Sequence, residues 1–231
     1  MKRSEINKII RDAELFVRSQ GFYLPKFANW SPSDWSGKGE EISEIRNNKL
    51  GWDVTDFGLE DFADKGVLLF TIRNGTLAQL AKGTGKVYCE KILVCQPNQL
   101  VLHHFHKAKT EDIINRGGGR LEIVLQQADH DECFNQNSLT ISLDGINTTV
   151  SAGGIIILEP GDSITLEPYQ SHQFRALDSA VLVGEVSTVN DDSNDNFFFE
   201  PVGRFPKIIE DEAPYRLLCT EYTGVFNESQ P

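Results

Sequence analysis

The sequence predicts an all-β-dominated protein, a sandwich or barrel of one domain that carries an N-terminal helix and irregular extensions. Three observations predict this fold class. At 231 residues the chain has a length at which barrels commonly form a single domain. Its 19 glycines and 9 prolines favour many turns. From about residue 66 onward, short β-branched and alternating runs follow one another between turn signals.

The N-terminal segment predicts one amphipathic helix. Ser4 can cap it, its apolar residues recur on one helical face, and Gly21 follows its expected end. The sequence from residue 25 to 56 is mixed, and only residues 40–46 indicate another short helix. We therefore expect residues 1–65 to form a helical extension packed on the barrel.

The central part of the chain predicts the strands of the barrel. Turn signals such as Asn74-Gly75, Asp144-Gly145 and the glycines at 117–119 separate the strand-like runs. We expect the barrel to span residues 66–190 and a C-terminal extension, residues 191–231, to pack back over it. The predicted strands are residues 67–73, 87–95, 99–106, 121–126, 139–143, 155–158, 163–166 and 181–187.

The net charge and the cysteines indicate which binding partners and which cellular compartment suit the chain. The formal net charge is −12 with no basic run, so we expect no nucleic-acid partner, and a neutral small molecule suits the chain better. The four cysteines form no C-x-x-C pair or short disulfide framework, which favours a reducing compartment. The first residues contain no signal-peptide core or membrane span. We expect a cytoplasmic protein without a membrane partner.

Three of the five histidines lie within four residues, in the run QLVLHHFHK. In a strand, residues two apart share a face, so His104 and His106 are expected to point together into the barrel and His103 away from it. Glu111 follows after KAKT, enough chain to bring a carboxylate back on the neighbouring strand. His172 is the candidate for a fourth ligand.

Imidazole nitrogen combined with carboxylate oxygen suits Mn²⁺, Fe²⁺, Zn²⁺, Co²⁺ or Ni²⁺ better than Ca²⁺ or Mg²⁺. The sequence thus predicts one divalent cation. We interpret His103 and His130 as ordinary core or surface histidines.

The run NQLVLHHFHKAKTEDIINRGG resembles the first motif of the cupins, with His104, His106, Glu111 and Gly118 in register. Asn98 stands where a glycine is usual, and asparagine is the next-best residue for a left-handed turn. GDSITLEPYQSH is similar to the second cupin motif. Its spacing to His172 is kept, but Tyr169 and other residues replace the usual turn residues. The resemblance implies a cupin, a jelly-roll barrel of the double-stranded β-helix type.

The segments HHFHKAKTEDIINRGGG, GEVSTVNDD and EDEAPYRLL, with the helical N-terminus, resemble the D-lyxose isomerase family of cupins over nearly the whole length. The resemblance implies aldose–ketose isomerisation of a free sugar: D-lyxose to D-xylulose, and also D-mannose to D-fructose. Mn²⁺ is the usual ion of that family, and a homodimer is its usual assembly.

Such a site would bind O1 and O2 of an open-chain sugar at the ion and move a proton between C1 and C2 through an enediol. A hydride shift is the rival route. Lys109, which lies between the ligands, is the candidate catalytic residue together with Glu111. Substrate-binding candidates are Lys91, Arg175 and Asp195. Glu185 and Glu210 are further candidate acid/base groups.

Other functions share these features. A cupin phosphosugar isomerase would need additional basic groups at the far end of the substrate, and an iron dioxygenase would consume oxygen with the same ligands. A sugar-binding cupin with a structural metal would show no turnover. The reaction class therefore depends on what surrounds the cluster.

Overall fold

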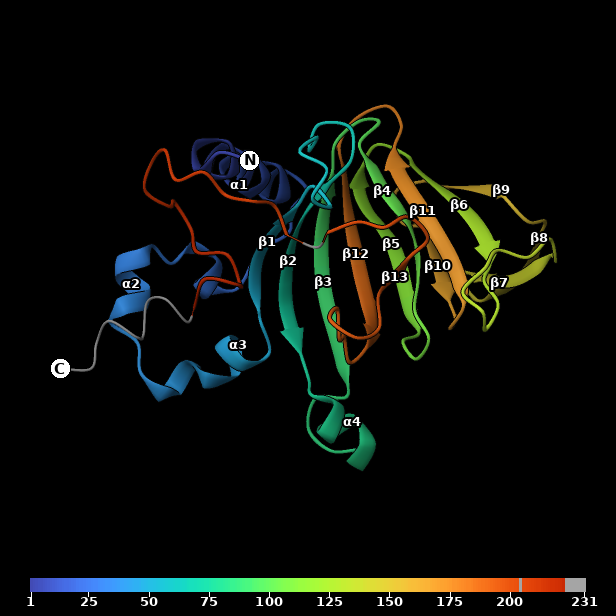
Figure 1. The fold of residues 1–231 in the computed structure, drawn as a ribbon, viewed down its shortest axis with the longest axis horizontal. Coiled ribbons are helices and arrows are strands. Elements are labelled where there is room, and N and C mark those ends of the chain that lie inside the picture. Colours follow the sequence, from blue (N-terminus) through green and yellow to red (C-terminus); the bar gives the residue numbers. More distant parts are fainter. Residues whose placement is uncertain (204, 223–231) are drawn as a thin grey trace.

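The computed structural model describes residues 1–203 and 205–222, and its core is a pair of antiparallel sheets that face each other (Figure 1). The larger sheet has the order β1-β2-β3-β12-β5-β10-β7-β8, and the smaller one has the order β13-β4-β11-β6-β9. Every predicted strand is present, and the predicted all-β class is confirmed. The strands of the larger sheet are β1 (Gly51–Thr55), β2 (Val67–Asn74), β3 (Tyr88–Cys95), β12 (Val181–Thr188), β5 (Glu111–Gly118), β10 (Ser163–Leu166), β7 (Leu139–Leu143) and β8 (Ile146–Val150).

The smaller sheet closes the other side of the core. β6 shows this most clearly: it alternates buried and half-buried residues, because one face packs inward and the other faces outward. The main hydrophobic cluster fills the space between the sheets, with residues such as Ile113, Leu125 and Phe174. The strands of the smaller sheet are β13 (Phe197–Phe198), β4 (Leu100–Phe105), β11 (Gln170–Ala176), β6 (Leu121–Gln127) and β9 (Gly154–Leu158).

The N-terminal helix α1 (Arg3–Ser19) covers the outer face of the larger sheet, next to β1 and β2 (Figure 1). Its apolar stripe, with Ile6 and Ile10, packs against sheet residues such as Trp52 and Phe70 in a second buried cluster. The helix begins two residues before the expected position. Lys2 is the N-cap, while Ser4 lies inside the helix and hydrogen-bonds the carboxylate of Asp211. The C-terminal segment thus docks on the start of α1.

Shorter helical elements surround the β1 side of the structure. The helix expected over residues 40–46 is present as two successive pieces, η2 and α3. None of the described helices has the length and apolar character needed to cross a membrane. The elements are η1 (Lys26–Asn29), α2 (Pro32–Ser36), η2 (Glu40–Ile42), α3 (Ser43–Asn47) and α4 (Leu77–Lys82), the last between β2 and β3.

The sheets extend beyond the predicted barrel boundaries. β1 lies within the predicted extension 1–65 but is the edge strand of the larger sheet, paired with β2. β13 lies within the predicted extension 191–231 and pairs with β4. Residue 204 and residues 223–231 of that extension lie outside the described residues. β1 is buried along its whole length because Trp52 and Val54 pack under α1, whereas Asp53 and Thr55 face the interior cavities.

Candidate metal centre and active site

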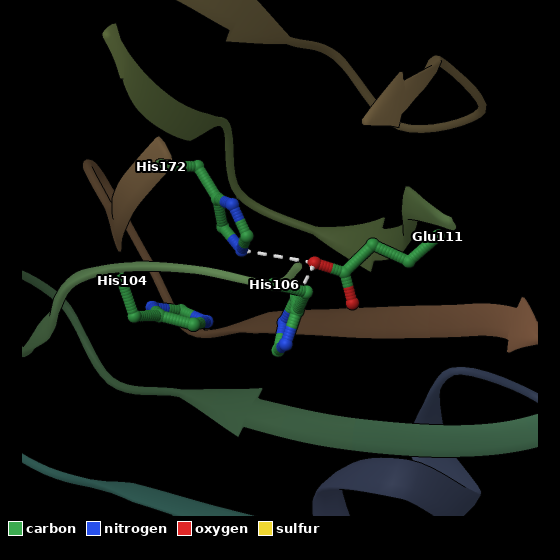
Figure 2. A group of neighbouring side chains, drawn as sticks. All are labelled: His104, His106, Glu111 and His172. Carbon is green, nitrogen blue, oxygen red and sulfur yellow. Dashed lines mark ion pairs between the residues drawn. The ribbon is translucent and has the colours of Figure 1, made fainter. Parts of the chain in front are cut away.

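Four buried side chains from both sheets converge on one point. His104 is on β4 and His172 is directly opposite it on β11, so these two come from the smaller sheet. His106 follows the end of β4, and Glu111 begins β5 in the larger sheet. One ligand atom from each of the four lies within 4.8 Å of all the others (Figure 2). The structure brings together all the residues that the sequence singled out as ligands.

Two details of this arrangement differ from the expectation. Glu111 does not return on the strand next to β4, because β5 belongs to the opposite sheet and pairs with β12 and β10. In addition, β4 contains a bulge: His172 pairs with His104, but Phe174 pairs with Val101. Because of the extra residue, Val101 and His104 line the same cavity, although residues three apart in a regular strand point to opposite faces. Strict alternation along β4 was therefore wrong.

The turns that flank the site keep the backbone of the cupin motifs. Asn98 has φ 62°, the left-handed conformation in which it replaces the usual glycine. Tyr169 has φ 66° in the second motif, so the turn is retained where the preferred residue is not. The ring of Tyr169 stacks on Phe105, with centroids 5.7 Å apart.

Backbone carbonyls fix the orientation of the three imidazoles. Nδ1 of His104 lies 2.7 Å from the carbonyl oxygen of Leu102, and Nδ1 of His172 lies 3.3 Å from that of Gln170. Nδ1 of His106 donates to the carbonyl of Asp195. Because a carbonyl only accepts, each Nδ1 carries the hydrogen and each Nε2 presents a lone pair. Burial lowers the pKa of His104 well below its ordinary value, and the neighbouring His172 lowers it further.

The carboxylate of Glu111 faces these lone pairs. Its Oε1 lies 3.1 Å from Nε2 of His172 and 3.3 Å from Nε2 of His106 (Figure 2). Oε1 and the His106 Nε2 are both buried and have no hydrogen-bond donor. Acceptors placed this close repel each other unless a cation lies between them. The donor set therefore fits a divalent ion, with three imidazole nitrogens and one carboxylate oxygen as its ligands.

Two buried lysines lie beside the cluster and are held by carboxylates. Nζ of Lys109 is 2.7 Å from Oε2 of Glu111 and 3.0 Å from Oε1 of Glu185. Nζ of Lys91 is 3.1 Å from the same oxygen of Glu185 and 3.5 Å from Oδ1 of Asp192. Burial opposes ionisation of Glu185, but the two lysines outweigh it and hold the pKa of that carboxyl below its ordinary value. The same balance, with Lys109 dominant, holds the pKa of Glu111 well below its usual range.

The other predicted residues lie elsewhere. Asp195 supports the site from behind: its carboxylate accepts hydrogen bonds from the backbone amides of residues 107–109, the loop between the ligands. Arg175 is on the outer face of β11, where its Nε is 2.8 Å from Glu122. Glu210 binds Arg3 at the start of α1. Neither Arg175 nor Glu210 lines the cavity, and His103 points away from it toward Ser171.

Sequence reasoning gave too little weight to Glu185. It touches both lysines, and the signal that could have found it is a lone carboxylate in the apolar run VLVGEVS. It missed Asp192 and Asn190, because loop residues after β12 reach the site only when the chain folds back. Asn190 Oδ1 accepts from Lys91 at 2.8 Å and from Lys109 at 3.3 Å.

The chain is similar to proteins that are named as sugar isomerases. The chain is 46% identical over 225 residues to a protein named D-lyxose/D-mannose isomerase from Serratia proteamaculans, covering 96% of this chain and 98% of that one. It is 44% identical over 230 residues to a protein of the same name from Escherichia coli O157:H7, with the same coverage.

Among solved structures, the L-ribose isomerase of Acinetobacter sp. DL28 in complex with L-ribose has a TM-score of 0.59 at 15% identity, covering 90% of this chain and 98% of that one. The L-ribose isomerase of Cellulomonas parahominis has a TM-score of 0.57 at 14% identity with the same coverage. These two show that the fold is shared. The model of the D-lyxose isomerase family matches residues 1–222, and the chain belongs to that family.

Proposed function

We propose that this protein is an aldose–ketose isomerase that interconverts D-lyxose with D-xylulose and D-mannose with D-fructose. The family assignment and the two bacterial relatives support the reaction class and these sugars. The observation that carries the proposal is the convergence of three imidazoles and one carboxylate beside a buried lysine and a second carboxylate.

His104, His106, Glu111 and His172 would hold the metal ion. When bound, a divalent ion acts as a Lewis acid that polarises the sugar carbonyl and stabilises the negative charge that develops on its oxygen. We propose Mn²⁺ because the resemblance to the D-lyxose isomerase family implies it. The mixed nitrogen and oxygen donors suit Mn²⁺, and they also accept Fe²⁺, Co²⁺, Ni²⁺ and Zn²⁺.

The residues around the ligands have distinct roles in the proton transfer. Glu185 is anionic and faces the same cavity as the ligands, so we assign it the transfer of the proton between C1 and C2. Lys109 stays cationic because Glu111 and Glu185 offset the cost of its burial, which raises its pKa overall. It can donate a hydrogen bond to the substrate oxygen next to the reacting carbon. Glu111 holds Lys109 in place through Oε2.

The charged groups beside the metal ligands do not favour a phosphosugar as the substrate. Lys91 and Lys109 are each paired with carboxylates, and Asp192, which lines the same cavity, adds a further negative charge. A phosphate dianion would meet these carboxylates before any cation without a partner. We therefore expect a large preference for D-mannose over D-mannose 6-phosphate.

The test is metal depletion followed by addition of single divalent ions, with ketose formation measured for a panel of free pentoses and hexoses. We expect turnover of D-lyxose and D-mannose that depends on the added ion and is greatest with Mn²⁺. Loss of turnover in Glu185→Gln with retained metal binding would support its role. An enzyme that prefers the phosphate ester, consumes oxygen, or turns over no sugar with any ion would overturn the proposal.

Isotope exchange separates the two routes of hydrogen transfer. In deuterated water, a proton carried by Glu185 exchanges with solvent and label appears in the product. Quantitative retention of the substrate hydrogen would instead assign a hydride shift. A homodimer and a cytoplasmic location stay predictions, which size measurement in solution and cell fractionation would check.

A further inference from the structure

A row of buried polar side chains leads away from the metal centre across the inner face of the larger sheet. Glu185, Lys91 and Thr71 are directly opposite one another on β12, β3 and β2. On β1 the residue opposite Thr71 is Gly51, and Asp53, two residues further along the same face, is opposite Leu69. Glu185, Lys91, Thr71 and Asp53 are all less than 10% exposed. Burial of polar groups costs free energy, so a row of them needs polar partners along its length. The row leads from one cavity to a second one.

The two cavities differ greatly in size. The inner cavity, which the metal ligands line, has a volume of about 50 Å³. This is room for only a few water molecules. The outer cavity has a volume of about 410 Å³, and its lining includes Asp53, Thr71 and Asp192. An open-chain pentose or hexose can therefore place only its reacting end in the inner cavity.

The cavities meet at a defined junction. Asp192 lines both, and Lys91, which lines the inner one, contacts Asn190 of the outer one at 2.8 Å. Asn190 is anchored to β2: its backbone amide donates to Oδ1 of Asn74 at 3.0 Å, and its carbonyl accepts from Nδ2 of Asn74 at 3.0 Å. The junction is thus built from a loop that is fixed to the sheet, with polar groups on both sides.

We propose that the outer cavity is the subsite for the non-reacting end of the sugar. Its hydrogen-bonding groups are Asp192 at the junction, and Thr71 and Asp53 on the next two strands beyond Lys91. This assignment rests on the proposed isomerase function. Carboxylates and hydroxyls are suitable partners for sugar hydroxyls. D-mannose has the configuration of D-lyxose at C2 to C4 and one further carbon with its hydroxyl at the far end. Its far end reaches deeper into the outer cavity, so Thr71 and Asp53 contribute to the hexose more than to the pentose.

The test compares kcat/KM for D-mannose and D-lyxose in the Mn²⁺-loaded full-length protein. Thr71→Val keeps the shape of the side chain and removes its hydroxyl, and Asp53→Asn keeps the shape and removes the charge. For each variant we expect kcat/KM for D-mannose to fall about tenfold, the effect of one lost hydrogen bond, and that for D-lyxose to fall less than about threefold. Asp178→Asn is the matched control, because Asp178 is exposed and pairs with Arg120. It should leave both values unchanged.

The ratio of the two rates guards against a folding defect, since a misfolded fraction lowers both rates equally. Inhibition of the unmodified enzyme by acyclic polyols gives a second measurement. D-mannitol should inhibit at least as strongly as D-arabinitol if the outer cavity accepts the longer chain. Unaltered ratios in both variants, or a hexitol that binds more than tenfold more weakly than the pentitol, would overturn the subsite while the isomerase function stands. Absence of turnover of either sugar would overturn both.

Discussion

Asp195 supports the loop of residues 107–109 between the ligands, so its removal should weaken metal binding. The size of the effect follows from the hydrogen bonds that its carboxylate accepts. The carboxylate of Asp195 accepts from the backbone amides of Lys107 at 2.6 Å, Lys109 at 2.9 Å and Ala108 at 3.1 Å. Its own carbonyl accepts from Nδ1 of His106. Asp195 thus holds both the loop between the ligands and one ligand ring.

The substitution Asp195→Ala removes three hydrogen bonds to a charged acceptor. Such bonds contribute about 1.5–3 kcal/mol each where no water replaces them. The loop is partly exposed, so water compensates for part of the loss and we expect a net effect of about 1.4–2.7 kcal/mol on metal binding. This corresponds to a Kd for Mn²⁺ that rises about 10- to 100-fold, the range found for groups that orient metal ligands. Asp195→Asn keeps one acceptor oxygen, so its Kd for Mn²⁺ should lie between those of the unmodified protein and Asp195→Ala.

The assay is calorimetric titration of the metal-depleted protein with Mn²⁺, checked by competition with a chelator. Asp191→Ala is the control, because Asp191 lies in the same loop but binds Ser193 and Asn194 of its own turn. It should leave the Kd unchanged. A Kd for Asp195→Ala within threefold of the unmodified protein would refute the reasoning, because the loop would then hold its shape without the carboxylate.

Three further predictions follow from other residues. Lys109→Met should lower kcat for D-lyxose by about 10² or more, the contribution of a donor to the oxygen on which charge develops, while Mn²⁺ still binds; unchanged kcat in steady-state kinetics would exclude Lys109 from the reaction. Asn98→Ala should lower the free energy of unfolding in urea by about 1 kcal/mol because of its positive φ, whereas Asn98→Gly should be nearly neutral; equal destabilisation by both would contradict the turn argument. Burial raises the pKa of the Cys89 and Cys95 thiols to about 12. At pH 8 a thiol reagent should therefore modify the exposed Cys133 and leave these two unmodified until the protein unfolds. Rapid labelling of either buried thiol in the native protein would contradict this and show that the β3 region opens.

Much of the fold could be predicted because it is encoded locally. The period-two pattern in runs such as residues 121–127 marks strands with one buried face, and the spacing of apolar residues marks α1. Among the strands that escaped prediction, two have a residue pattern that depends on tertiary neighbours. β11, QSHQFRA, has a polar residue, His172, on its inward face, and β1 is buried on both faces.

The sequence by itself singled out the four candidate ligands, because their residue types suit a divalent cation and their spacing follows the two cupin motifs. Only the tertiary structure decided that Glu111 comes from the opposite sheet, that Glu185 lies between two lysines, and that Asp195 supports the site while Arg175 faces outward. The physical reason is that contacts between residues far apart in the chain depend on sheet order and on bulges. A bulge changes which side chains share a face. The residue pattern within one strand does not specify which other strand pairs with it.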